Sequence, residues 1–348
     1  MIVVSGGAGF VGSHVAEFYA HRGERVLVVD DRSRADLLGV EQAQLDNWEW
    51  VKRLPNVEAV EASILDADLL PDLVAGARAV VHAGAQTAVT VSLIDPRTDF
   101  LVNALGTMNL LEAVRAAAPR AALVFCSTNK VYGENVNALP VRRERMRYAF
   151  EGEWQAGVPE TLSIDHCEHS PYGVSKTTGD LYVQEYGRLY GLRTAVFRMS
   201  CIYGPRQWGV SDQGWLAWFA RAALTGLPLT IYGDGRQTRD VLYVSDLVAA
   251  IDAALETELH GEVFNIGGGP DLGCSLLEAL EWLERLTGRR PSVRYEDWRP
   301  CDQRIYVSDT RKAQRRLGWQ PRVGLELGIG SLLEWLRTSG SQVRERVT

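Results

Sequence analysis

Near its amino terminus the chain reads Ser5-Gly6-Gly7-Ala8-Gly9-Phe10-Val11-Gly12, directly after the apolar run Ile2-Val3-Val4. Gly6, Gly9 and Gly12 form the pattern G-x-x-G-x-x-G, which permits a tight turn and close approach of the backbone to a pyrophosphate. A helix that begins in this stretch presents free N–H groups, and these groups and the helix dipole both favour an anion. The stretch therefore predicts a strand, a dinucleotide-binding loop and a helix, with Phe10 and Val11 as further contacts to the dinucleotide.

The first two thirds of the chain alternate short β-branched runs with helical stretches, which is the pattern of a parallel sheet with crossover helices. We therefore predict an α/β fold built on a doubly wound, Rossmann-type parallel sheet. The expected strands are residues 2–4, 25–29, 57–60, 79–82, 122–126 and 193–197. The expected helices between them are residues 12–22, 69–75, 99–118 and 171–190.

The pattern changes after Tyr203, where loops rich in Gly, Trp and Arg alternate with expected helices at 215–225, 245–256, 276–287 and 325–336. We predict that residues 1–200 form the nucleotide-binding domain and that residues 236–265 return to it. Residues 201–348 are expected to form a smaller, mixed α/β substrate lobe over the carboxyl edge of the sheet, where open α/β sheets bind ligands. Residues 140–168 are expected to form an insertion or lid.

The bulk composition excludes several classes of protein. The 348 residues carry a net charge of −7, which gives no general affinity for nucleic acid or for an anionic membrane. The five cysteines are spread along the chain without a C-x-x-C pair, which argues for reduced thiols. No apolar run approaches the roughly 20 residues of a membrane span. We therefore expect a cytoplasmic protein with no signal peptide and with neither nucleic acid nor membrane as a partner.

Two acidic residues follow the second expected strand. Asp30 ends that strand, where its carboxylate is placed to bind the ribose hydroxyls of an adenosine. Asp30 and Asp31 side by side would repel a 2′-phosphate, which favours NAD over NADP as the cofactor. Arg32 and Arg34 argue in the opposite direction, so NADP stays as the alternative.

A tyrosine and a lysine four residues apart indicate the chemistry. Tyr172 and Lys176 lie in Ser170-Pro171-Tyr172-Gly173-Val174-Ser175-Lys176, and on a helix this spacing puts both on one face. A nearby ammonium favours the phenolate and is expected to lower the tyrosine pKa from about 10 toward neutrality. Thr128 follows another apolar strand, so its hydroxyl can hydrogen-bond to the same substrate. The three side chains predict a base that takes a proton from a sugar or alcohol hydroxyl.

With these motifs the sequence resembles the extended short-chain dehydrogenase/reductase family, in particular its nucleotide-sugar epimerases and dehydratases. The resemblance implies that Thr128 is the catalytic Ser/Thr, Tyr172 the base, and Lys176 its partner that also holds the nicotinamide ribose. Ser63 stands where the family usually has an Asp that meets the adenine, so Asp66 is an alternative contact. The further cofactor contacts that the resemblance implies are Ser63, Ile64, Gly84, Asn103 and Ser127. The family also uses an Asn at the position of Asn103 to place the catalytic helix and a water, and a satisfied polar group within a helix is the alternative.

The residues after Thr128 separate the reactions of this family. Sugar 4,6-dehydratases carry an Asp-Glu pair there, because water elimination needs an extra acid and base, whereas this chain has Asn129 and Lys130. A narrower resemblance, to the CDP-paratose (CDP-tyvelose) 2-epimerases, rests on Ser127-Thr128-Asn129-Lys130-Val131-Tyr132-Gly133, His169-Ser170-Pro171-Tyr172-Gly173, Asp212-Gln213-Gly214-Trp215 and Asp302-Gln303-Arg304. It implies NAD-dependent inversion at C2 of a CDP-deoxyhexose, through a transient keto-sugar to which the hydride returns. The alternatives are a 4-epimerase, dehydrogenase or 4,6-dehydratase of the same fold, and a non-catalytic nucleotide-sensing protein.

Inversion requires that the nucleotide diphosphate is anchored firmly while the hexose turns. Arg239 and Arg299 match the family's phosphate-binding arginines, and charge-assisted fork contacts suit a pyrophosphate. Arg206 is a weaker candidate, for which a solvated surface charge is the alternative. The other residues that we assign to the substrate are Asn129, Gln213, Tyr232 and Asp302.

Two further expectations concern assembly and metals. Residues 99–118 and 171–190 resemble the helices that pair across the family's dimers, which implies a homodimer or homotetramer, although their apolar positions could all face their own sheet. His166 and His169 flank Cys167, but no second pair of ligands accompanies them, so no metal site is expected.

Overall fold

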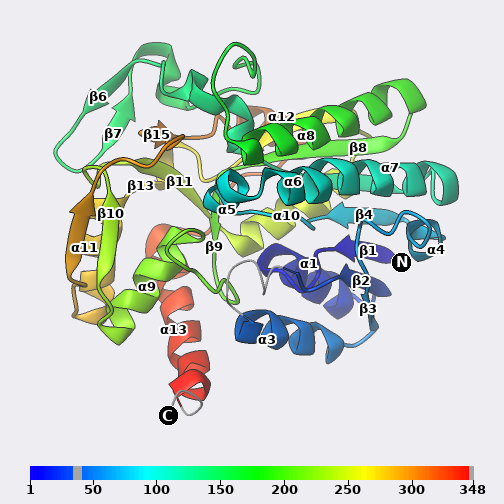
Figure 1. Cartoon of the computed structure of the whole chain (residues 1–348), viewed down its shortest axis with the longest axis horizontal. Coiled ribbons are helices and arrows are strands. Elements are labelled where there is room, and N and C mark those ends of the chain that lie inside the picture. The colour runs from blue at the N-terminus through cyan, green and yellow to red at the C-terminus, as the bar shows by residue number, and fades with distance from the viewer. Residues whose placement is uncertain (34–40, 345–348) are drawn as a thin grey trace.

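A seven-stranded, all-parallel sheet forms the core of the computed structural model, which describes residues 1–33 and 41–344 (Figure 1). Its strands are β1 (Ile2–Ser5), β2 (Val26–Asp30), β3 (Val57–Glu61), β4 (Ala79–His82), β5 (Ala122–Thr128), β8 (Arg193–Met199) and β12 (His260–Ile266). Their order is β12-β8-β5-β4-β1-β2-β3, so the winding of the sheet reverses between β1 and β4. The predicted doubly wound sheet is confirmed, and β12 adds a strand beside the six that were predicted.

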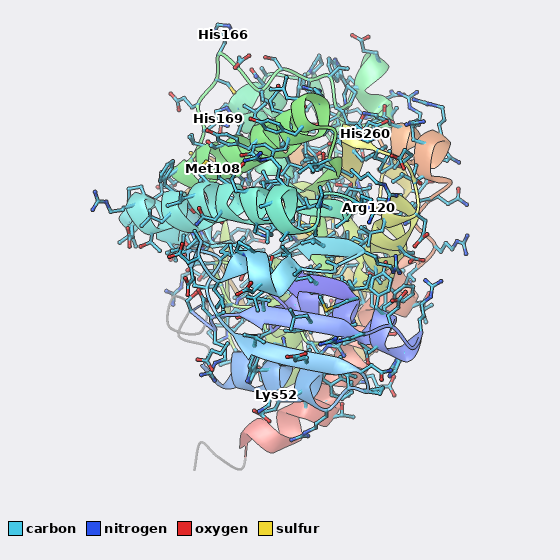
Figure 2. The ribbon with its side chains drawn as sticks, turned by 90° about the vertical axis from the view of Figure 1, so that its right-hand side faces the viewer. Lys52, Met108, Arg120, His166, His169 and His260 are labelled. Atoms are coloured by element: carbon cyan, nitrogen blue, oxygen red, sulfur yellow. The ribbon has the colours of Figure 1, made fainter. Side chains whose placement is uncertain are left out.

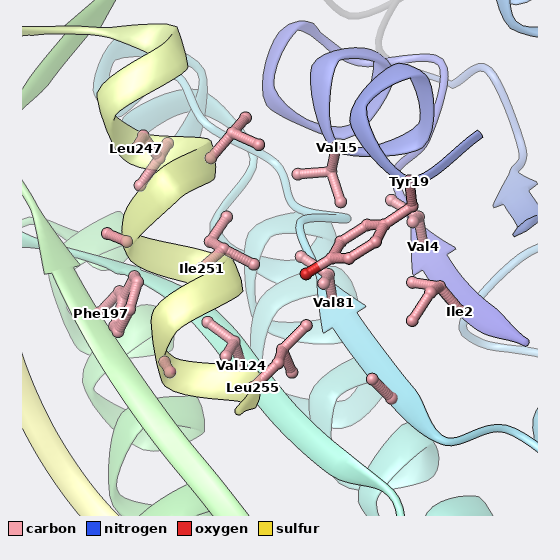
Figure 3. Packing of buried hydrophobic residues seen from close by; sticks show 14 of the residues in the cluster. Ile2, Val4, Val15, Tyr19, Val81, Val124, Phe197, Leu247, Ile251 and Leu255 are labelled. Carbon is pink, nitrogen blue, oxygen red and sulfur yellow. The ribbon is translucent and has the colours of Figure 1, made fainter. Parts of the chain in front are cut away.

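Helices cover both faces of the sheet, because successive strand residues point to opposite faces and both sets are apolar. On one face, Tyr19 and Ile251 belong to a cluster that packs on strand residues such as Val4 and Val124 (Figure 3). On the other face, helices pack on Val3 and its equivalents. The first face carries α1 (Phe10–His21), α3 (Glu41–Lys52) and α10 (Val244–Leu255), and the second carries α4 (Leu70–Val74), α7 (Gly106–Ala117) and α8 (Pro171–Tyr190).

The predicted helix at 99–118 is interrupted in the structure. Two short helices, α5 (Val89–Ile94) and α6 (Pro96–Phe100), precede a π-helical turn at Leu101–Leu105, and α7 follows it. A π-helical turn contains one residue more than an α-helical turn and is frequent at functional sites. This turn carries Asn103, which is buried.

Most of the chain beyond β8 forms several smaller sheets. The exceptions are β12, which is a strand of the large sheet, and two helices: α10, which packs on that sheet, and α12 (Arg311–Leu317), which packs on β12. The division into domains at residue 200 stays a prediction. A four-stranded sheet contains β9 (Cys201–Tyr203), β11 (Thr238–Tyr243), β13 (Gly273–Ser275) and β15 (Ile305–Tyr306), and a two-stranded sheet contains β10 (Leu229–Tyr232) and β14 (Val293–Glu296). The helices packed here are α9 (Trp215–Thr225), α11 (Leu276–Thr287) and α13 (Leu325–Arg344).

Residues 140–168, predicted as an insertion or lid, contain a small hairpin. Its strands are β6 (Val141–Arg143) and β7 (Tyr148–Phe150), and the segment packs in a separate apolar cluster with the 3-10 helical stretch Asn129–Val136 and with β15. Within residues 1–33 and 41–344, no helix combines the length and the apolar character that crossing a membrane requires.

Candidate active site

A cavity lies at the carboxyl ends of β1, β2, β4 and β5, beside the point where the winding of the sheet reverses. Doubly wound sheets bind their ligands at this point. The loop 83–87 after β4, together with Met199 and Gly214, contributes lining residues that, apart from Gly84, were not predicted. The predicted cofactor residues that line the cavity are Gly6, Gly9, Phe10, Val11, Gly12, Asp30, Asp31, Ile64, Gly84, Ser127, Tyr172 and Lys176.

The glycine loop lies so close to neighbouring backbone that side chains would not fit. A β-carbon at Gly12 would come within 2.2 Å of the carbonyl oxygen of Gly6, and one at Gly6 would come within 2.5 Å of the amide nitrogen of Gly84. Gly6 also has a φ of +70°, which glycine adopts without strain. Gly9 is the N-cap residue of α1 and has no side chain to accept a hydrogen bond from the first turn. The N–H groups of this turn, whose residues line the cavity, are therefore left without a side-chain cap. These residues therefore fit the pyrophosphate of a dinucleotide.

Asp30 ties the glycine loop to the end of β2. Its carboxylate accepts hydrogen bonds from the backbone N–H of Ala8 at 2.9 Å and of Arg32 at 2.8 Å. The side chain is buried and lines the cavity. The contact between Asp30 and a ribose stays a prediction.

At the rim of the cavity Ser63 and Asp31 form one polar group. The Ser63 hydroxyl donates to the Asp31 carboxylate at 2.8 Å, and Ile64, the next residue, lines the cavity. Neither Ser63 nor Asp66 lines the cavity itself, and Asp66 is exposed. Which of the two meets an adenine stays a prediction.

Tyr172 lies in the first turn of α8, which Ser170 caps by accepting a hydrogen bond from the N–H of Gly173. The Thr128 hydroxyl hydrogen-bonds to the phenol, so the two predicted catalytic groups meet. Burial raises the pKa of Tyr172 to about 12; the bond to Thr128 acts in the opposite direction, and the charge of Asp99 raises the pKa further. This is the reverse of the predicted lowering, because desolvation outweighs the effect of the hydrogen bond and Lys176 is not among the groups that shift this pKa.

Lys176 lies one turn along α8 from Tyr172, and its side chain is almost completely buried. The ammonium donates to the carbonyl of Cys126 at 2.7 Å and sits 4.2 Å from the centre of the Phe125 ring. Burial lowers the pKa of Lys176 to about 8. The ammonium is therefore held at the wall of the cavity. It loses its charge only slightly above neutral pH.

A buried polar network joins α8 to the loop after β4, and of its members only Asn103 was expected to position the catalytic helix. The carboxylate of Asp99 accepts hydrogen bonds from the Gln86 amide at 2.8 Å, from the Asn103 amide at 3.2 Å and from the Ser175 hydroxyl at 2.5 Å. Asn103 does not line the cavity, because its amide also bonds the backbone N–H and carbonyl of Gln86 at 3.0 Å each. Asn103 is therefore placed to position the loop and the helix that carries Tyr172. The spacing of Asp99 and Asn103 at i, i+4 is the only trace of this network in the sequence.

Ser127 lines the cavity, but its hydroxyl points to a buried ion pair. It donates to Asp180 at 2.9 Å, and Asp180 pairs with Arg198 at 2.9 Å. All three side chains are buried. Ser127 therefore supports the wall of the cavity from the end of β5.

The predicted substrate arginines each lie beside an acidic residue. Arg239 on β11 pairs with Asp302 at 2.9 Å. Arg299 pairs with Asp212 at 2.9 Å, and its guanidinium lies 3.8 Å from the centre of the Tyr232 ring. The loop 299–302 thus connects the two ion pairs, and four of the predicted substrate residues gather around it.

Two other predicted substrate residues connect the lobe to the large sheet. The Asn129 amide donates to the side-chain oxygen of Gln303 at 3.3 Å, next to Thr128. Gln213 lines the cofactor cavity, where its amide donates to the Thr87 hydroxyl. Gln213 therefore closes one side of the cavity against the loop after β4.

Arg206 lies away from the other predicted substrate arginines. Its guanidinium pairs with Glu17 of α1 at 2.7 Å and donates to the Ser13 hydroxyl at 3.2 Å. The structure does not bring Arg206 to Arg239, because its charge is already paired at the contact with α1.

The two histidines considered as metal ligands lie apart in Figure 2, where His166 extends on a loop above His169. His169 hydrogen-bonds to the carbonyl of Ile164 at 2.9 Å. In the described part of the chain, no group of three or more His, Cys, Asp or Glu side chains could hold a metal ion.

The model of the NAD dependent epimerase/dehydratase family matches residues 2–267, so the chain belongs to this family. It is 35% identical over 343 residues to the CDP-paratose 2-epimerase of Salmonella typhi, a match that covers 96% of this chain and 98% of that protein. It is also similar to a UDP-glucose 4-epimerase of Mycolicibacterium smegmatis, at 30% identity over 96% of this chain and 98% of that one. A dTDP-glucose 4,6-dehydratase of Streptomyces niveus is 32% identical, over 97% and 92%.

Solved structures agree with this assignment along nearly the whole chain. The UDP-glucose 4-epimerase of Thermotoga maritima with UDP-glucose is 32% identical, with a TM-score of 0.80 and coverage of 97% of this chain and 99% of that one. The UDP-glucose 4-epimerase of Thermus thermophilus in complex with NAD is also 32% identical, with a TM-score of 0.77 and coverage of 97% and 98%. The chain is thus an NAD-dependent enzyme of the epimerase/dehydratase class, and NAD is its cofactor.

Proposed function

We propose that this enzyme inverts C2 of a CDP-deoxyhexose, as in the conversion of CDP-paratose to CDP-tyvelose. The observation that carries the proposal is the 35% identity to a CDP-paratose 2-epimerase over almost all of both chains. The sequence after Thr128 supports epimerisation over dehydration, because Asn129 and Lys130 provide neither of the acids that water elimination needs.

The proton transfer falls to Tyr172. Its phenolate, hydrogen-bonded to Thr128, takes the proton of the substrate hydroxyl and becomes a phenol, and it returns that proton when the sugar is reduced again. NAD, when bound, supplies the acceptor from which the hydride comes back. Because burial raises the pKa of Tyr172, the phenolate needs a cation nearby. We assign this role to Lys176, one helical turn away, whose ammonium has to turn from the Cys126 carbonyl toward the phenol to act on that pKa. Proton and hydride both return, so the reaction has no net oxidation.

The substrate diphosphate is assigned to the basic residues around the loop 299–302. Arg239 and Arg299 offer the fork geometry that suits phosphate oxygens, and Tyr232 lies against Arg299. Their present partners, Asp302 and Asp212, are partly exposed, so they can turn away when a stronger anion binds. Firm binding of the diphosphate leaves the hexose free to turn between the two hydride transfers.

The test is to give the purified enzyme a CDP-hexose deuterated at C2, without added NAD, and to follow product and label by NMR. The proposal expects an epimer inverted at C2 that retains its deuterium, because the same hydride leaves and returns. Inversion at C4 with the C2 label untouched would instead identify a 4-epimerase, the reaction of the Mycolicibacterium smegmatis relative. A released keto-sugar would indicate a dehydrogenase or dehydratase. No turnover together with tight binding of the nucleotide would indicate a sensing protein.

We also propose that the enzyme forms a homodimer through α8 and α6. Val174, Leu181 and Leu189 recur about every second turn on one face of α8 and are 53%, 45% and 72% exposed. Phe100 of the neighbouring α6 is 54% exposed. Sedimentation analysis of Leu181→Glu tests this surface, because a charge at its centre should yield monomers. A cytoplasmic location stays a prediction.

A further inference from the structure

Lys130 differs from Arg239 and Arg299, the two arginines that we assign to the substrate. In the described structure its ammonium donates one hydrogen bond, to the carbonyl of Cys301 at 3.2 Å, and it forms no ion pair. Its neighbour Arg239, by contrast, pairs with Asp302 at 2.9 Å. An ammonium has three donors, so one carbonyl leaves most of its capacity unused.

The position of Lys130 links the catalytic groups to the phosphate-binding region. Its backbone N–H donates to the side-chain oxygen of Thr128 at 3.2 Å, so its main chain adjoins the catalytic hydroxyl. Its ammonium reaches the loop 299–302, which carries Arg299 and Asp302. The side chain thus extends from the reacting end of the site toward the arginines.

The electrostatics of this position call for an anion. Burial lowers the pKa of Lys130, the charge of Asp302 acts in the opposite direction, and that of Arg239 lowers the pKa further. Cys201 and Cys301 are the other titratable groups that act on Lys130, and neither carries a charge at neutral pH. An anion between Lys130 and Arg239 would add an attraction to each cation that offsets their mutual repulsion, and it would supply acceptors for the ammonium.

We propose that Lys130 binds a phosphate oxygen of the substrate, on the phosphate that carries the sugar. The inference rests on the proposed function. C2 is bonded to the carbon that carries this phosphate, whereas C4 lies across the ring from it. Lys130, adjoining Thr128, therefore reaches the sugar-linked phosphate when C2 faces Thr128 and Tyr172, and it favours this orientation over the one that would present C4.

The test measures binding of CDP and of inorganic pyrophosphate to the holoenzyme by titration calorimetry. Lys130→Met keeps the length of the side chain and removes the charge, and Lys130→Arg keeps the charge. We expect Lys130→Met to weaken the binding of both ligands roughly 10-fold to 100-fold, the usual loss for a charge-assisted hydrogen bond, and Lys130→Arg to stay within about 3-fold. Lys52→Met is the matched control. Lys52 lies on α3, where it pairs with Glu49, and within the described residues it neither lines the cavity nor contacts the loop 299–302.

A second measurement needs no variant. The chain has four lysines, and Lys52 and Lys130 are distinguishable by mass spectrometry after brief acetylation with acetic anhydride. Pyrophosphate should protect Lys130 from acetylation and leave the reaction of Lys52 unchanged. A Lys130 that is acetylated in the free holoenzyme, and to the same extent with pyrophosphate, would overturn the inference even if Lys130→Met failed to fold.

The outcomes separate this inference from the proposed function. If the wild-type enzyme binds neither CDP nor pyrophosphate, both fail together. If it binds both ligands and Arg239→Met weakens them while Lys130→Met does not, the substrate site stands and the role of Lys130 is refuted. In that case Lys130 only ties the loop 299–302 to Thr128.

Discussion

Two substitutions of Asp99 distinguish the hydrogen bonds of the buried network from its charge. In Asp99→Ala, one N–H of the Gln86 amide loses its acceptor, while Ser175 keeps the carbonyl of Tyr172 at 3.1 Å and Asn103 keeps Gln86. A buried donor without an acceptor costs about 1–3 kcal/mol. The lost carboxylate also leaves a void, so we expect the free energy of unfolding to fall by about 2–4 kcal/mol.

Asp99→Asn should be much milder. The amide oxygen can accept from Gln86 and Asn103 as the carboxylate does, and the amide N–H can donate to the Ser175 hydroxyl, which then donates to the Tyr172 carbonyl. Since every group keeps a partner, we expect a loss of less than about 1 kcal/mol. The charge is nevertheless gone, and because Asp99 raises the pKa of Tyr172, that pKa should fall.

The assay is urea unfolding of the holoenzyme at pH 7, followed by circular dichroism, together with the NAD content of each purified variant. Asp68→Asn is the control, because Asp68 is exposed, and it should change stability by less than about 0.5 kcal/mol. Asp99→Ala should also retain less NAD, since Gln86 belongs to the loop that lines the cavity. Equal losses of stability for Asp99→Ala and Asp99→Asn would refute the reasoning, because the charge and not the hydrogen bonds would then hold the network.

Three further predictions concern the cavity and its catalytic groups. Tyr172→Phe should lower epimerisation, measured by NMR, at least about 100-fold while NAD content is unchanged; turnover that persists would exclude Tyr172 as the base. Gly12→Ala should yield protein without NAD, because its β-carbon would lie 2.2 Å from the Gly6 carbonyl oxygen, whereas Gly330→Ala, with no atom within 4 Å, should bind NAD normally; NAD released on denaturation is measured by absorbance. Lys176→Met should raise the free energy of unfolding at pH 7, because the folded pKa of Lys176 is lowered from 10.5 to about 8 and its burial in the charged form opposes folding. Between pH 8 and 10.5 Lys176 is protonated in the unfolded chain and increasingly neutral in the folded one, so the free energy of unfolding of the wild type rises with pH. The difference in this free energy between Lys176→Met and the wild type should therefore shrink over this range in denaturant titrations.

The parts of the fold that were predictable depend on local sequence. The predicted helix 171–190 has the bounds of α8, because Ser170 caps it, Pro171 fits its first turn and Gly191 ends it in the left-handed conformation. The strands and the glycine loop were predictable for the same reason, since apolar runs and glycine spacing act over a few residues. By contrast α3 was not predicted. Of its described residues only Trp48 and Val51 pack in the core, so the apolar spacing that reveals a helix in a sequence is weak there.

The parts that were not predictable depend on partners distant in the sequence. Arg206 was a reasonable phosphate ligand until Glu17 of α1 proved to be its partner. Asn103 was predicted both as a cofactor contact and as the residue that positions the catalytic helix, and its amide hydrogen-bonds to Gln86 and to Ser175 of α8 rather than lining the cavity. The pKa of Tyr172 was predicted from the charge of its neighbour alone, whereas burial by the rest of the fold decides its direction.

The hydrogen bond between Gln213 and Thr87 joins two distant parts of the chain at the cavity. Gln207, Gln213 and Gly214 come from the segment that follows β9, yet they line the cavity together with the glycine loop. A dinucleotide lying there would contact this segment as well as the glycine loop, so both parts of the chain would contribute to its affinity. Substitutions in the segment after β9 should therefore alter how tightly NAD is retained, although they lie far from the glycine loop in the sequence.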